Sequence, residues 1–131
     1  KLLRFPPPVI AHTDIINQRM LAAGLDSGDC LLCISHSGRT RAMVELAQLG
    51  TAAGATVIAL TAPASPLAAV CDLLLAVVSH EDTDLYTPMS SRIAQLVIVD
   101  IIATRLAQRQ GPGFSRRLQL LKSNLASTRH P

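Results

Sequence analysis

Short apolar runs alternate with helix-like segments along most of this 131-residue sequence. The run Cys30–Ser35 is almost continuously apolar, which is typical of a parallel strand that is covered on both faces. We predict strands over Val9–Thr13, Cys30–Ser35, Thr56–Thr61 and Leu73–Val78, and helices over Asp14–Leu25, Arg41–Ala53, Leu67–Cys71, Thr87–Gln110 and Phe114–Ser127. This alternation predicts an α/β domain, in which a parallel sheet carries helices on both sides as a three-layer α/β/α sandwich.

The composition is that of a single globular domain. It is 49% hydrophobic and 16% charged, and the chain is long enough to bury a core. Because there is no Trp, one Tyr and two Phe, few aromatic surfaces are available on which nucleic-acid bases can stack. The net charge is +3, and no acidic residue follows Asp100. We interpret this basic end as a solvated helix face, with weak and salt-dependent DNA binding at most.

Metal, redox and membrane functions find little support in the sequence. Cys30 and Cys33 lie three positions apart in a predicted strand, so they point to opposite faces, and we expect both to be small buried hydrophobes. The four histidines lack metal-ligand spacing, and we expect no cofactor. The longest apolar stretch, 93–103, is interrupted by Gln95 and Asp100 and falls short of the about 20 residues of a membrane span. We therefore expect a cytoplasmic protein that does not contact a membrane.

The six residues from Ser35 to Thr40, Ser-His-Ser-Gly-Arg-Thr, join a predicted strand to a predicted helix. A helix N-terminus leaves about four backbone N–H groups unpaired and carries positive partial charge, so it favours an anion. The hydroxyls of Ser35, Ser37 and Thr40 can donate to phosphate oxygens. Gly38 lets the backbone approach a ligand closely, and Arg39 can add a charge-assisted bond. The alternative is an ordinary helix cap, because Ser and Thr are common caps and Gly is a common turn residue.

Several segments together resemble the sugar isomerase (SIS) domain. They are the S-x-S-G-x-T loop at 35–40, the strand Val57–Thr61, the Ser65-Pro66-Leu67-Ala68 turn and the strand at 72–75. The segment Asp84–Leu96, with Asp100 after it, is similar to the C-terminal half of RpiR-family transcriptional regulators, and more narrowly to their HexR-like branch. The resemblance implies a flavodoxin-like fold and a domain that senses a sugar phosphate. For the HexR-like branch it implies the effector 2-keto-3-deoxy-6-phosphogluconate, which relieves repression.

The same resemblance implies roles for the loop residues and for parts that we expect outside this chain. The implied phosphate ligands are the hydroxyls of Ser35, Ser37 and Thr40 and the backbone amides of His36, Gly38 and Arg39. RpiR-family regulators bind DNA through an N-terminal helix-turn-helix domain. A complete SIS domain begins with a strand, a G-x-G-x-S turn and a helix, of which Lys1–Phe5 resembles only the tail. We therefore expect residues 1–131 to be one incomplete SIS domain, without its first β-α unit and without the DNA-binding domain.

Two other classes of function remain open. SIS domains also form aldose-ketose isomerases, in which a carboxylate moves a proton between adjacent carbons. Glu81, with Asp82 and Asp84 beside it, is the candidate for that base, although such a cluster is more often a solvated turn. The other class is a dimerisation module without a ligand, in which the hydroxyls of the loop only cap a helix.

Self-association is a separate expectation. The predicted helix Thr87–Gln110 is apolar on more sides than one sheet can cover, and an exposed apolar patch of that size favours association. The first strand of the family's sheet is expected between Val9–Thr13 and Cys30–Ser35, so its loss leaves two strand edges unpaired. RpiR-like SIS domains are also expected to pair, so that two DNA-binding domains can meet two half-sites. We therefore expect a homodimer or a larger assembly.

Overall fold

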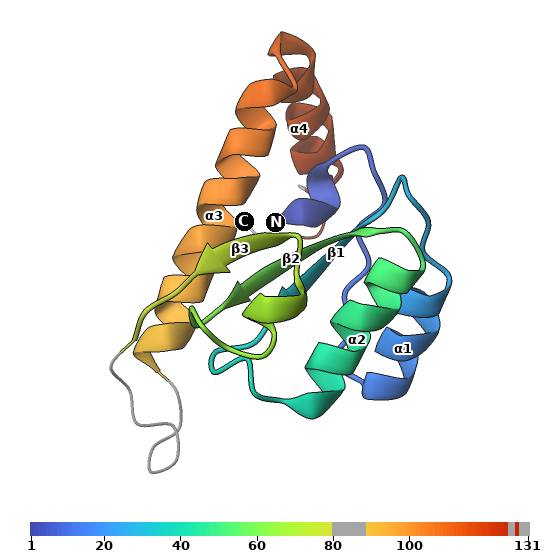
Figure 1. The fold of residues 1–131 in the computed structure, drawn as a ribbon. Helices are drawn as coiled ribbons and strands as arrows, with labels where there is room; N and C mark the ends of the chain where they lie inside the picture. The colour runs from blue at the N-terminus through green and yellow to red at the C-terminus, as the bar shows by residue number, and fades with distance from the viewer. Residues whose placement is uncertain (80–88, 126–127, 129–131) are drawn as a thin grey trace. The chain divides into compact units, whose positions relative to one another are not determined.

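Three parallel strands form the sheet in the described part of the chain, which comprises residues 1–79, 89–125 and 128 of a computed structural model. The strands are β1 (Cys30–Ile34), β2 (Thr56–Thr61) and β3 (Leu73–Ala76), in the order β1-β2-β3 (Figure 1). Leu31 pairs with Val57, and Ile58 pairs with Leu73, so β2 lies between the other two strands. The predicted α/β class with a parallel sheet is confirmed.

Apart from a short helix at residues 2–4, for which none was predicted, the helices follow the predicted segments with shifts of up to three residues at their ends. They are the 3-10 helices η1 (Leu2–Arg4) and η2 (Ala68–Val70) and the α-helices α1 (Ile15–Ala23), α2 (Arg41–Ala52), α3 (Ser90–Arg109) and α4 (Pro112–Asn124). The Asp14 carboxylate caps α1, because it accepts a hydrogen bond from the Asn17 N–H (2.9 Å). Thr87 and Pro88, the predicted start of α3, lie outside the described residues. No described helix is both long enough and apolar enough to cross a membrane.

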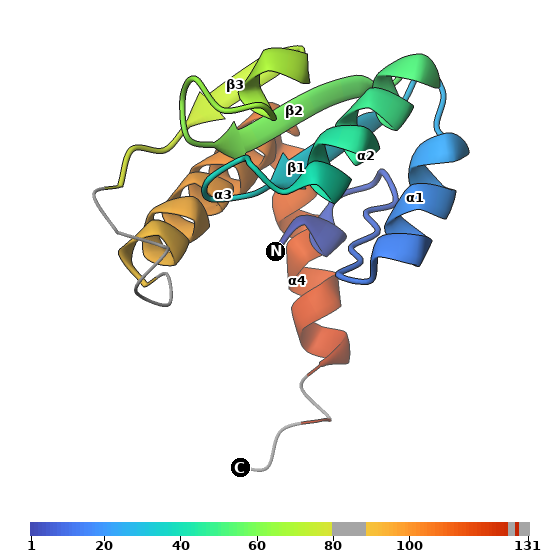
Figure 2. The same ribbon diagram turned by 60° about the horizontal axis from the view of Figure 1, so that its bottom comes forward.

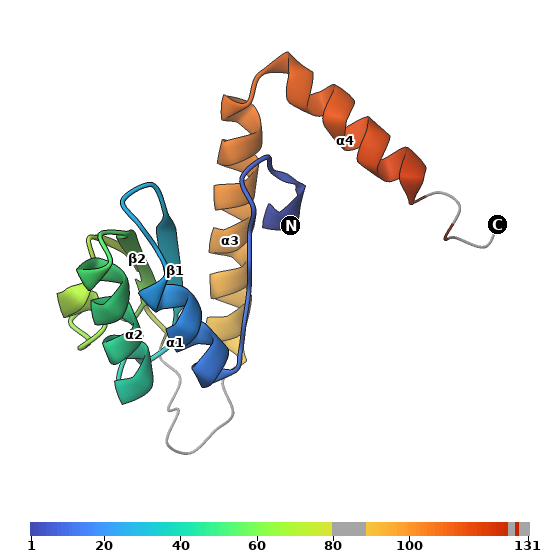
Figure 3. The ribbon, with the colours of Figure 1, turned by 90° about the vertical axis from the view of Figure 1, so that its right-hand side faces the viewer.

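The larger of two compact units, His12–Leu96, contains the sheet. Within it, α2 packs on β1 and β2, and α1 packs beside α2 (Figures 2 and 3). Gly50 permits a close approach of α2, because a Cβ at this position would lie only 2.7 Å from Leu31 Cδ2. The buried core of this unit comprises Ala22, Cys33, Leu46, Ala47, Val57, Ala59 and Leu67. Burial of these side chains fixes α2 against the sheet, and with it the loop that precedes α2.

The predicted strand over Val9–Thr13 is wrong, since this segment is in no strand. Its Ile10 side chain is 63% exposed, and the His12 carbonyl accepts a hydrogen bond from the Gln18 side chain. A strand needs a neighbour that pairs with its backbone, and β-branched composition alone does not provide one. β1 is paired with β2 alone, so its other side is an edge of the described sheet.

The smaller unit consists of Lys1–Ala11 and Val97–Pro131 and is organised around two aromatic rings. The buried Phe5 and Phe114 rings stack with their centroids 4.9 Å apart and their planes 12° from parallel. Gly111 has φ +70°, which a side chain disfavours, and the chain turns there from α3 into α4 (Figure 3). The stack therefore joins the start of the chain to α4.

α3 exposes much of its apolar surface. The side chains of Ile93, Leu96, Val97 and Ile101 are each more than half exposed. Ile98 and Ile102 are half-buried. The predicted excess of apolar residues on this helix is therefore observed as exposed surface.

Candidate functional site

The candidate site is the segment Ser35–Thr40, here called the hydroxyl loop, which connects β1 to α2. The Ser35 N–H donates to the Leu60 carbonyl (3.1 Å), so the loop leaves the sheet at the carboxyl end of β1. Of its residues, Ser35, His36 and Ser37 are half-buried, Gly38 is buried, and Arg39 and Thr40 are exposed. The crevice outside the carboxyl ends of parallel strands is where open α/β folds bind ligands. The predicted site residues thus lie together at such an edge.

The helix that follows the loop is not capped by a side chain. Thr40 is the N-cap residue of α2, but its hydroxyl makes no capping hydrogen bond. Its carbonyl accepts the hydrogen bonds from the Met43 and Val44 N–H groups, as the start of a helix requires. An ordinary cap would make a hydrogen bond from its side chain to a backbone N–H, and Thr40 makes none. The Thr40 hydroxyl and the first N–H groups of α2 therefore remain available to an anion.

Two carbonyls of the hydroxyl loop point toward the segment that follows β2. The His36 carbonyl accepts from the Ala62 N–H (3.0 Å), and the Gly38 carbonyl accepts from the Leu67 N–H (3.1 Å). In a planar trans peptide the N–H points opposite to the carbonyl. The N–H groups of Ser37 and Arg39 are therefore directed away from that segment, as an anion site built from backbone amides requires.

Hydrogen bonds within the loop use its serine oxygens as acceptors. Ser35 Oγ accepts from the Gly38 N–H (3.2 Å), and Ser37 Oγ accepts a long bond from the Arg39 N–H (3.4 Å). Each hydroxyl keeps its own hydrogen, which can be donated to a ligand oxygen. The Gly38 and Arg39 N–H groups, two of the predicted phosphate ligands, are thus used within the loop, whereas the hydroxyl hydrogens of Ser35 and Ser37 stay available to a phosphate.

Both the backbone conformation at Gly38 and the residues packed against it exclude a side chain at this position. It has φ +62°, and a Cβ at this position would lie 2.3 Å from Ser65 Oγ and 2.5 Å from Thr61 Oγ1. The space that the missing side chain leaves is therefore occupied by these two residues. In the sequence, Thr61 ends a predicted strand and Ser65 begins a turn, and their contact with the loop was not predicted. The only signal was a pair of hydroxyl residues where the neighbouring strand ends.

The His36 ring lies in the loop, and the cysteines lie outside it. His36 Nδ1 is buried and has no hydrogen-bond partner among the described residues. Burial raises the pKa of the Cys33 thiol to about 11, with a smaller contribution from Cys71. Cys33 is buried as predicted, whereas Cys30 is exposed because it lies at the first position of an edge strand. No group of three potential metal ligands occurs in the part of the chain that the structure describes.

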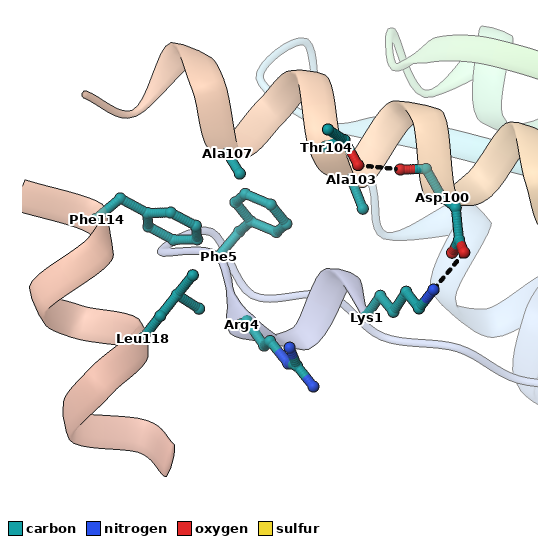
Figure 4. Close-up of a pocket in the computed structure, with 9 residues that line it drawn as sticks. All are labelled: Lys1, Arg4, Phe5, Asp100, Ala103, Thr104, Ala107, Phe114 and Leu118. Carbon is teal, nitrogen blue, oxygen red and sulfur yellow. Dashed lines mark hydrogen bonds and ion pairs between the residues drawn. The ribbon is translucent and has the colours of Figure 1, made fainter. Parts of the chain in front are cut away.

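A pocket of about 260 Å³ lies elsewhere, within the smaller unit (Figure 4). Its apolar wall includes the stacked Phe5 and Phe114 and the side chain of Leu118. At its other end Lys1 forms an ion pair with Asp100. The pocket contains no residue of the hydroxyl loop. The acidic candidates Glu81, Asp82 and Asp84 lie outside the described residues.

Two known proteins with similar sequences are transcriptional regulators about twice as long as this chain. The transcriptional regulator HexR of Pseudomonas aeruginosa is 44% identical over 131 residues, which are 100% of this chain and 46% of that protein. HexR of Escherichia coli is 43% identical over 129 residues, which are 98% of this chain and 45% of that protein. The chain therefore spans about half the length of these relatives.

Solved structures share the fold. NanR of Vibrio vulnificus, complexed with ManNAc-6P, matches 99% of this chain and 49% of its own, with a TM-score of 0.88 and 22% identity. The sugar isomerase domain of an RpiR transcription factor from Sphaerobacter thermophilus matches 88% of this chain and 62% of its own, with a TM-score of 0.68 and 17% identity.

The family model of the SIS domain matches residues 5–105, which include the sheet, the hydroxyl loop and most of α3. The sequence and the fold thus agree, and the chain belongs to the SIS domain family.

Proposed function

We propose that this chain is the sugar-phosphate-sensing domain of a bacterial transcriptional regulator of carbohydrate metabolism. The observation that carries the proposal is the hydroxyl loop, whose outward Ser37 N–H and uncapped helix start suit a phosphate. Similarity to HexR over the whole chain supports the regulatory role. The loop binds the phosphate, and residues around it select the sugar.

We propose 2-keto-3-deoxy-6-phosphogluconate as the effector, on the strength of the similarity to HexR. This molecule carries a phosphate at one end and a carboxylate at the other. The phosphate occupies the hydroxyl loop. Binding of the effector changes the affinity of the longer protein for DNA, which that protein contacts through a helix-turn-helix domain. This takes place in the cytoplasm, where DNA and sugar phosphates are both present.

Pairing of two such domains is part of the proposal. The exposed apolar residues of α3, among them Ile93, Leu96 and Ile101, favour association of two copies. A dimer also suits a regulator, because two DNA-binding domains then meet two half-sites. Sedimentation equilibrium at micromolar concentration is expected to give at least a dimer, and a monodisperse monomer would contradict this part.

A thermal-shift panel tests the function. The full chain is expected to gain melting temperature with phosphorylated pentoses, hexoses and keto-deoxy acids, most strongly with the proposed effector, and not with the unphosphorylated sugars. NMR is expected to detect no exchange of the protons on the sugar carbons with solvent. Exchange would instead indicate the isomerase alternative, and the absence of any shift would indicate a domain that only dimerises.

A further inference from the structure

Beneath the hydroxyl loop lie two buried hydroxyl side chains. Thr61, at the end of β2, is 0% exposed, and Ser65, before η2, is 7% exposed. Both lie against Gly38, because a Cβ built at this position would lie within 2.6 Å of atoms of both side chains. Because both side chains are buried beneath Gly38, we expect any part that they have in binding to act through the loop.

Hydrogen bonds connect the two side chains to a loop carbonyl. The Ala68 N–H donates to Ser65 Oγ (3.2 Å), Ser65 Oγ lies 3.4 Å from Thr61 Oγ1, and Thr61 Oγ1 donates to the His36 carbonyl (3.5 Å). A hydroxyl has one hydrogen to donate, and this fixes which group donates in each of these hydrogen bonds. Thr61 gives its hydrogen to His36, so Ser65 donates to Thr61 while it accepts from Ala68.

The last of these hydrogen bonds fixes the orientation of one peptide unit. The His36 carbonyl accepts from both the Ala62 N–H and the Thr61 hydroxyl, so both of its lone pairs are used on the side of β2. The N–H of Ser37 belongs to the same peptide unit and points the opposite way. Ser65 meanwhile sets how closely Gly38 approaches, since its Oγ lies 2.3 Å from where a Cβ of residue 38 would be.

We propose that Thr61 and Ser65 are positioning residues of the hydroxyl loop, which hold the His36 carbonyl inward and thereby aim the Ser37 N–H at the phosphate. This inference rests on the proposed function for the identity of the ligand. The orientation of the loop itself is a property of the ligand-free protein, so it can be measured separately.

The test uses Thr61→Val, which removes the hydroxyl at nearly constant volume, and Thr61→Ser, which keeps it. Thr56→Val is the matched control, because Thr56 is exposed at the opposite end of the same strand. Amide resonances of residues 36–40 are recorded in the free chain and during titration with inorganic phosphate. Thr61→Val is expected to move these resonances and to weaken phosphate binding by about tenfold, the equivalent of one misaligned hydrogen bond. Thr61→Ser and Thr56→Val are expected to leave the loop resonances and the phosphate affinity close to those of the wild type.

Unchanged loop resonances and unchanged phosphate affinity in Thr61→Val would overturn the inference. So would weaker binding without movement of the loop resonances. If the wild type binds neither phosphate nor a sugar phosphate while Thr61→Val still moves the loop, the positioning role stands and the proposed function fails. Ser65→Ala, which removes one oxygen atom beneath Gly38, is the second variant if Thr61→Val does not fold, and it is expected to give the same two effects.

Discussion

Asp72 and Val57 exchange two hydrogen bonds at the start of β3. The Asp72 N–H donates to the Val57 carbonyl (2.9 Å), and the Val57 N–H donates to Asp72 Oδ2 (2.7 Å). The carboxylate thus takes the place of a strand carbonyl for a residue that is fully buried. The pair sets where β3 begins to pair with β2.

Asp72→Ala is expected to lower the free energy of unfolding by about 1 to 3 kcal/mol, because it leaves the buried Val57 N–H without an acceptor. Chemical denaturation measures this change. Asp72→Asn keeps an acceptor oxygen and is expected to lose less. Asp26→Ala is the control, since it removes a similar bond to the Gly28 N–H at an exposed turn, where water replaces it. Equal losses in Asp72→Ala and Asp26→Ala would contradict the role of Asp72.

Local patterns predicted elements whose apolar periodicity is clear in their own sequence. β2 was predicted at its observed bounds, and α2 within one residue. The predicted strand Val9–Thr13 failed because pairing depends on a neighbour, which local composition does not specify. The contact of Gly38 with Thr61 and Ser65 was also missed, because it joins segments more than twenty residues apart in sequence. The phosphate-binding role of the hydroxyl loop remains a prediction.

Gly38→Ala is expected to weaken binding of the sugar phosphate by more than about tenfold, because the new methyl group displaces the loop from Thr61 and Ser65. The positive φ adds strain of about 1 to 3 kcal/mol, which thermal denaturation detects. Gly113→Ala provides the contrast, since nothing lies within 4 Å of its Cβ position in α4. There the same substitution is expected to stabilise by about 0.5 to 1 kcal/mol. Wild-type affinity in Gly38→Ala would show that the loop tolerates displacement.

Ser37→Ala is expected to weaken sugar-phosphate binding by about tenfold to a hundredfold, the loss of one charge-assisted donor worth roughly 1.5 to 3 kcal/mol. Stability is expected to change little, because Ser37 Oγ accepts only one long hydrogen bond within the loop. Isothermal titration and thermal denaturation measure the two quantities. Thr51→Ala is the matched control, since that hydroxyl bonds the Ala47 carbonyl in the last turns of α2. An unchanged titration curve for Ser37→Ala would remove this hydroxyl from the site.

Cys33 is expected to make the fold sensitive to alkali. Burial raises the pKa of its thiol to about 11 in the folded chain, so the unfolded chain loses this proton at a lower pH. The unfolded state therefore binds fewer protons in that window, and stability falls as the pH rises from about 9 toward 11. Cys33→Ala is expected to flatten this part of the curve of unfolding free energy against pH.

At pH 8, alkylation followed by mass spectrometry is expected to label the exposed Cys30 well before Cys33. Equal labelling rates would contradict the burial of Cys33.

The division of the chain into units has a consequence for the order of events during synthesis. The unit His12–Leu96 is one continuous stretch, so its sheet can assemble as soon as that stretch leaves the ribosome. The first eleven residues belong to the other unit, and Phe5 must wait for Phe114 before its ring has a partner. We therefore expect Lys1–Ala11, although it is made before the sheet, to settle after it, since a contact between residues so distant in sequence is slow to close.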